Sequence, residues 1–263
     1  MNIRILAIGD IIGTPGQNFF QKNIKEFCQK HRVNGLIVNG ENSADGRGIT
    51  PKIMNFFQHH GVNMVTSGNH VWQKKEIYPY FAAHKDLLRP ANYPGDCPGS
   101  GIGIFTCNGI SVGVINVQGR VFIRDFVSCP IRAIESALTF LKSRTSVILV
   151  DMHAEATSEK AATALYFDGK ISALYGTHTH VQTSDERILP GGTAFISDVG
   201  MCGALNAVIG MKKEPVINHM LTQMPHRFEV ETEGPFVLGG ALFEIDSESG
   251  RAISVERIRI IEN

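Results

Sequence analysis

Gly176-Thr177-His178-Thr179-His180 is the stretch around which this chain is organised. It follows an apolar run, residues 171–175, that is typical of a buried strand. Two histidines two positions apart in extended backbone point to the same side, so both imidazoles could bind metal there. An isolated pair of this kind is explained equally well as two loop histidines without a ligand role. The remaining strand ends decide between these interpretations.

Four other apolar runs, at residues 3–8, 35–38, 63–66 and 147–150, also lead into polar residues. The metal-binding or acid–base side chains that follow them are Asp10, Glu41, Asn42, Asn69, His70 and His153. In open α/β sheets the functional crevice lies beyond the carboxyl ends of the strands. Each residue alone has an ordinary explanation, such as a capped turn or a buried histidine. Because five strand ends share the pattern, we expect one common site.

The pattern of elements predicts an α/β domain with mixed sheets, because strands alternate with helices and hairpins follow late in the chain. Helices are predicted over residues 15–28, 51–60, 130–143 and 157–167. Thr50-Pro51 is a helix start, and Asn108-Gly109 indicates a hairpin turn. A closing hairpin is predicted over residues 236–261. The simplest division is one domain over residues 1–263, with a small cap around 201–233 as an alternative.

Composition excludes several classes of protein. The chain has 263 residues and equal numbers of basic and acidic side chains, 25 of each, which argues against a broad basic face for long nucleic acid. Its five cysteines are scattered without a C-x-x-C pair, which favours free thiols in a reducing cytoplasm. We expect neither a signal peptide nor a membrane-spanning segment, and therefore no membrane partner.

The candidate ligands are carboxylates, amides and imidazoles, with no sulfur. Such a set suits Mn, Fe or Zn better than Cu(I), and its histidines argue against Ca or Mg alone. There are too many groups for one tetrahedral ion. Two ions about 3.5–4 Å apart would use them all, and Glu41 is the best candidate to bridge them.

Four short blocks resemble the signatures of calcineurin-like metallophosphoesterases: Gly9-Asp10, Gly40-Glu41-Asn42, Gly68-Asn69-His70 and Gly176-Thr177-His178-Thr179-His180. The match is closest to the YmdB-like bacterial branch, which has similar long blocks at residues 151–160 and 196–201. The resemblance covers nearly the whole chain. It implies a layered α/β/β/α sandwich, a homo-oligomer and a phosphodiesterase acting on cyclic nucleotides, including 2′,3′-cyclic and 3′,5′-cyclic ones.

The resemblance also implies a role for each site residue. Asp10, Glu41, Asn42 and His180 would bind the first metal, and Glu41, Asn69, His153 and His178 the second. His70 would protonate the leaving oxygen after attack by a hydroxide held between the metals. Ile12 stands where the wider superfamily has a histidine, which makes Fe or Mn more favoured than Zn.

Two other functions fit the same residues. One is a phosphomonoesterase or nucleotidase that uses the same two metals, and the other is a regulator that binds a nucleotide without cleaving it. Trp72 has two interpretations as well, because it either stacks a substrate base in the pocket or packs in the core.

Overall fold

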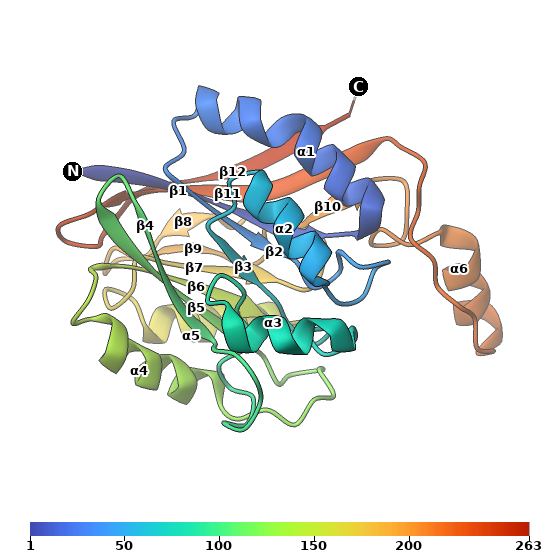
Figure 1. The fold of residues 1–263 in the computed structure, drawn as a ribbon, viewed down its shortest axis with the longest axis horizontal. Helices are drawn as coiled ribbons and strands as arrows, with labels where there is room; N and C mark the ends of the chain where they lie inside the picture. Colours follow the sequence, from blue (N-terminus) through green and yellow to red (C-terminus); the bar gives the residue numbers. More distant parts are fainter. Residues whose placement is uncertain (263) are drawn as a thin grey trace.

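The computed structural model describes residues 1–262 and contains two sheets packed face to face, with helices on the outer faces (Figure 1). The strands of the first sheet are β1 (Asn2–Ile11), β2 (Gly35–Asn39), β3 (Met64–Thr66), β10 (Met201–Ala204), β11 (Phe236–Asp246) and β12 (Ala252–Ile261). The strands of the second are β4 (Ile102–Cys107), β5 (Ile110–Gln118), β6 (Val147–His153), β7 (Ala173–Thr177), β8 (Arg187–Ile188) and β9 (Ala194–Ile196). Their orders are β12-β11-β10-β1-β2-β3 and β4-β5-β6-β7-β9-β8, and both sheets mix parallel and antiparallel pairs.

The helices complete the layers. They are α1 (Gly13–Lys30), α2 (Pro51–His59), the short 3-10 turn η1 (Lys75–Ile77), α3 (Tyr78–Ala83), α4 (Pro130–Leu141), α5 (Thr157–Tyr166) and α6 (Lys213–Thr222). Helices α1 and α2 pack on the first sheet, and α4 and α5 pack on the second. The predicted α/β/β/α sandwich with mixed sheets is therefore confirmed.

Strand β1 contributes to two hydrophobic cores because its side chains alternate between the two faces of the sheet. Leu6 and Ile8 pack under α1 and α2, whereas Ile5 and Ala7 pack between the two sheets. A run of apolar residues on both faces is what a fully buried strand requires. The end of β1, where Asp10 lies, is thereby fixed between helices α1 and α2 and the second sheet.

A bulge in β1 turns Asp10 toward the second sheet. The register between β1 and β2 shifts between Ile8 and Asp10, and a bulge of this kind reverses the face to which later side chains point. Gly9 is needed there because a Cβ at this position would lie 1.8 Å from the carbonyl oxygen of Gly200.

Several local predictions are confirmed. Helix α2 begins at Pro51, with the Thr50 hydroxyl accepting a hydrogen bond from the Ile53 amide at 3.3 Å. Strands β4 and β5 form the hairpin expected at Asn108-Gly109, and both turn residues have positive φ. Strands β1 and β6 are longer than predicted, so Asp10 and His153 lie within strands rather than beyond them.

The span 201–233 is divided between the sheet and a projecting arm. Residues 201–204 form β10, which pairs with β1 and β11, so any cap can begin only after Ala204. Helix α6 extends away from the sandwich on the side where the β-strands of the site end (Figure 1). Within residues 1–262, no helix combines the length and apolar character needed to span a bilayer.

Candidate metal centre

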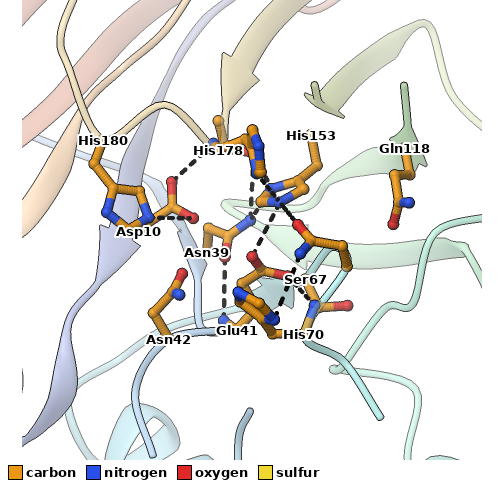
Figure 2. A network of polar contacts seen from close by, with 12 residues as sticks. Asp10, Asn39, Glu41, Asn42, Ser67, His70, Gln118, His153, His178 and His180 are labelled. Atoms are coloured by element: carbon orange, nitrogen blue, oxygen red, sulfur yellow. Dashed lines mark hydrogen bonds and ion pairs between the residues drawn. The ribbon is translucent and has the colours of Figure 1, made fainter. Parts of the chain in front are cut away.

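The predicted site residues lie together where strands of both sheets end (Figure 2). From the first sheet come Asp10 in β1, Glu41 and Asn42 after β2, and Asn69 and His70 after β3. From the second sheet come His153 at the end of β6, and His178 and His180 after β7. The site thus spans the junction between the two sheets.

Four ligand atoms of the proposed second metal lie close together, around one ring nitrogen. His153 Nε2 is 3.0 Å from Glu41 Oε1, 2.9 Å from Asn69 Oδ1 and 3.0 Å from His178 Nδ1. One nitrogen carries at most one hydrogen, so hydrogen bonding can account for only one of these contacts. Ligand atoms about 2.1 Å from an ion and at right angles to each other lie about 3 Å apart. The spacing therefore fits a shared cation.

His153 fits there because residue 68 is glycine. A Cβ at Gly68 would lie 2.1 Å from the imidazole of His153, closer than any side chain tolerates. The glycine of the Gly68-Asn69-His70 block is thus a packing requirement of the centre.

The residues expected at the first metal leave buried oxygens free. Among residues 1–262, Asp10 Oδ1 and Asn42 Oδ1 are buried without a hydrogen-bond partner. Asn42 Nδ2 donates to the carbonyl of Gly46 at 2.9 Å, which turns the amide oxygen of Asn42 inward. His180 Nε2 lies 3.7 Å from Asp10 Oδ1. Buried polar atoms normally have partners, so these orphaned oxygens fit a cation.

His178 and His180, two of the predicted metal ligands, each have a partner on the second ring nitrogen. His180 Nδ1 lies 2.9 Å from the carbonyl of Ile209, and His178 Nε2 lies 3.2 Å from the Glu155 carboxylate. Partners of this kind fix the orientation of metal-binding imidazoles.

Burial shifts the pKa values of four site residues toward their uncharged forms. It raises the pKa of Asp10 and of Glu41, whereas it lowers the pKa of His153 to about 4 and that of His178 to about 3. Both imidazoles are thus neutral at pH 7, the form that binds metal. A cation would offset the cost of desolvating the two carboxylates.

The backbone of residues 176–180 differs from the prediction. The extended conformation expected for the two histidines is wrong, because β7 ends at Thr177 and His178 and His180 have φ of 99° and 63°. Asp198 stabilises this loop by accepting a hydrogen bond from the Thr179 amide at 3.2 Å. The buried Lys160 ammonium binds the Asp198 carboxylate at 2.8 Å and the carbonyl of Thr177 at 3.0 Å.

Lys160 is a site-supporting residue that the sequence reasoning did not identify. It falls on the same face of α5 as the buried Thr163 and Ala164, three and four positions later. A lysine on the buried face of a helix is a signal that it pairs with a buried acid.

His70 lies beside the two ligand clusters. Its backbone amide donates to Glu41 Oε2 at 3.0 Å, and its ring borders a cleft of about 870 Å³. Arg47, Arg227 and Phe228 also line this cleft, the last two from the arm that follows α6. Burial lowers the pKa of His70, an effect that the nearby Glu41 carboxylate opposes.

Trp72 packs in the core of the first sheet. Its ring contacts Tyr78, Phe81 and Tyr93 at centroid distances of 5.5–5.9 Å. The core interpretation of Trp72 is therefore the one that agrees with the structure.

Comparison with known proteins gives the family. The sequence model of the family described as YmdB-like protein matches residues 6–258. This chain belongs to that family. The resemblance inferred from the four short blocks is confirmed.

The YmdB-like chain is similar to its relatives over nearly their whole length. This chain is 43% identical over 258 residues to the 2′,3′-cyclic-nucleotide 2′-phosphodiesterase of Bacillus subtilis strain 168, and the match covers 98% of this chain and 97% of that one. A crystal structure of a novel phosphatase from Mycoplasma pneumoniae has a TM-score of 0.93 at 34% identity, covering 100% and 95% of the two chains. A hypothetical protein from Thermus thermophilus has a TM-score of 0.91, also at 34% identity, covering 99% and 100%.

Proposed function

We propose that this YmdB-like chain is a metal-dependent phosphodiesterase that hydrolyses cyclic nucleotides, with 2′,3′-cyclic nucleotides as its main substrates and 3′,5′-cyclic ones as secondary substrates. The substrate class is supported by the name of the Bacillus subtilis relative. The observation that carries the proposal is the convergence of Glu41, Asn69 and His178 on His153 Nε2, at 2.9–3.0 Å.

The chain would hold two ions with the ligand sets expected from the sequence. Asp10, Asn42 and His180 would bind one ion, and Asn69, His153 and His178 the other. Glu41 would bridge them, which its two carboxylate oxygens permit. We propose Fe or Mn as the native metals, with Zn as the alternative, because imidazole nitrogens are combined with many oxygens.

Hydrolysis joins a water oxygen to phosphorus and breaks one phosphorus–oxygen ester bond, so the leaving ribose oxygen needs a proton. The metals, when bound, would supply positive charge to the phosphoryl oxygens and lower the pKa of water. His70 would deliver this proton in its protonated, imidazolium form, because its ring borders the cleft in which the substrate would lie. The hydrogen bond from the His70 amide to Glu41 would hold this acid beside the metals.

The cleft supports a small anionic substrate. Its volume of about 870 Å³ is in the range typical of small-molecule pockets. Arg47 and Arg227 at its edge complement a phosphate, and Phe228 offers an aromatic surface for a base.

One preparation of the purified protein should be tested both for metal content and for cleavage of a panel of substrates. The panel contains 2′,3′-cyclic, 3′,5′-cyclic and linear nucleotide monophosphates, each assayed before and after removal of metal with a chelator. We expect metal-dependent cleavage that is fastest with the 2′,3′-cyclic compounds. Metal-loaded protein that binds these compounds but cleaves none of them would support a non-catalytic regulator instead.

A phosphomonoesterase is the second candidate, because the Mycoplasma pneumoniae relative is described as a phosphatase. Faster release of phosphate from linear monophosphates than from cyclic ones would favour it. Both enzymes would use the same centre, so only the substrate panel separates them.

We also propose a cytoplasmic location and a homo-oligomeric state. Free thiols at Cys28, Cys97, Cys107, Cys129 and Cys202 support a reducing compartment. Light scattering on the purified protein measures the oligomeric state, and a monomer at micromolar concentration would contradict it.

A further inference from the structure

The side of the His153 ring that faces away from the metal centre is held by a chain of buried side chains. His153 and Thr177 are register partners on the parallel strands β6 and β7. His153 Nδ1 lies 3.0 Å from Thr177 Oγ1, while Nε2 faces the proposed metal. Which of the two nitrogens carries the hydrogen therefore decides whether Nε2 can act as a ligand.

The hydroxyl hydrogen of Thr177 is committed to Asp151. Thr177 Oγ1 lies 2.8 Å from Asp151 Oδ1, and the other carboxylate oxygen of Asp151 pairs with the Thr66 hydroxyl. Asp151 is completely buried in β6. Its Oδ1 accepts a hydrogen bond when the carboxyl is ionised and also when the proton lies on Oδ2. Thr177 Oγ1 can then interact with His153 Nδ1 only as an acceptor.

Asn39 is the other polar group beside His153 Nδ1. Its Oδ1 accepts a hydrogen bond from the Glu41 amide at 3.1 Å, which turns its Nδ2 toward Thr177 and His153. Asn39 Nδ2 lies 3.3 Å from Thr177 Oγ1 and 3.5 Å from His153 Nδ1. The threonine oxygen has two lone pairs, so it can accept from both Asn39 and His153.

We propose that Thr177, oriented by Asp151, is a positioning residue that holds His153 with its hydrogen on Nδ1 and its lone pair on Nε2 toward the metal. The inference rests on the metal centre proposed above and adds residues outside the ligand set. Neither Thr177 nor Asp151 touches the cleft, so both act through His153. His180 has a main-chain carbonyl in the same role, whereas the partner of His153 is a side chain that substitution can remove.

The test compares two substitutions of similar size. Thr177→Val removes the hydroxyl and leaves Asn39 Nδ2, a donor, 3.5 Å from His153 Nδ1. This favours hydrogen on Nε2, where a metal must displace it. Thr177→Ser keeps the hydroxyl. We expect Thr177→Val to weaken Mn²⁺ or Zn²⁺ binding by about 10- to 100-fold, a typical loss for such partners, and Thr177→Ser to bind within about threefold of the natural protein.

Nitrogen NMR of ¹⁵N-histidine-labelled, metal-free protein reads the position of the hydrogen directly. We expect a larger fraction of Nδ1–H at His153 in the natural protein and in Thr177→Ser than in Thr177→Val, because Glu41 and Asn69 offer acceptors to Nε2 in all three forms. The same fraction of Nδ1–H in the natural protein and in Thr177→Val, or equal metal affinity in all three forms, overturns the inference. If the natural protein has more Nδ1–H than Thr177→Val but binds no metal, the proposed function fails and the positioning of His153 stands.

Discussion

The Glu41 carboxylate connects the two halves of the proposed chemistry. Its Oε1 lies 3.0 Å from His153 Nε2, the proposed metal-binding nitrogen, and its Oε2 accepts a hydrogen bond from the backbone amide of His70 at 3.0 Å. One buried side chain thus fixes both the metal centre and the residue proposed as the acid. Any change at Glu41 should disturb both, whereas a change in the His70 ring should disturb only proton transfer.

His70→Ala is expected to keep its metals and to lose turnover by about 10²- to 10⁴-fold, because a general acid of this kind typically contributes that much. Steady-state kinetics together with elemental analysis checks this. The control is His59→Ala, at the exposed end of α2, which should behave as the natural protein. Unchanged turnover in His70→Ala would remove its role as the acid.

Ligands and supporting residues differ in how readily the sequence predicts them. Glu41 and His153 could be predicted because polar groups at strand ends are conspicuous after apolar runs. Thr177 and Asp151 could not, because each looks like an ordinary strand residue until the register of β6 against β7 is known.

At the scale of elements, α5 holds the loop after β7 in place. Lys160 reaches from α5 to Asp198, which also accepts hydrogen bonds from the amides of Thr179 at 3.2 Å and Gly200 at 2.9 Å. The left-handed backbone of His178 and His180 therefore depends on a buried ion pair outside the metal centre.

Lys160→Met should destabilise the protein by about 3–5 kcal/mol, because it leaves the Asp198 carboxylate buried without its partner. Denaturant unfolding of the metal-free protein measures the loss. The double variant Lys160→Met, Asp198→Asn should recover much of it, since the uncompensated charge is gone. Equal stability of Lys160→Met and the natural protein would show that the pair does not hold the loop.

Elements with local signals could be predicted, and those defined by distant contacts could not. The Thr50-Pro51 start and the Asn108-Gly109 turn act within a few residues, so both were correct. The extended backbone predicted for the two histidines was wrong because Lys160 and Asp198 are far from them in sequence. The short strand β10 was missed because only its pairing with β1 and β11 defines it.

At the scale of the whole molecule, the centre ties the two sheets together. Asp10 belongs to β1 of the first sheet, and His178 follows β7 of the second sheet. The backbone amide of His178 donates a hydrogen bond to the Asp10 carboxylate at 3.1 Å. The sequence predicts the layers, because apolar runs alternate with amphipathic helices. It cannot predict the sheet order, because β1 pairs with β10 and β11 from the far end of the chain.

Removing metal should therefore lower the stability of the whole sandwich. Metal present at about 1,000 times its dissociation constant would add about 4 kcal/mol, because it binds the folded state alone. Thermal unfolding with and without chelator measures the difference. In Glu41→Gln, which lacks the bridging carboxylate, the unfolding temperature should respond little to metal. A natural protein whose unfolding temperature ignores metal would contradict the cross-sheet centre.

Metal stoichiometry measures whether the strand ends of both sheets together bind a pair of ions. Elemental analysis of the purified protein after loading with Mn or Fe gives ions per chain. About two ions are expected in the natural protein, as in two-metal phosphoesterase sites, and fewer in Asp10→Asn, where the first ion loses one of its two carboxylate ligands. Less than one ion per chain in the loaded natural protein would contradict the two-ion centre.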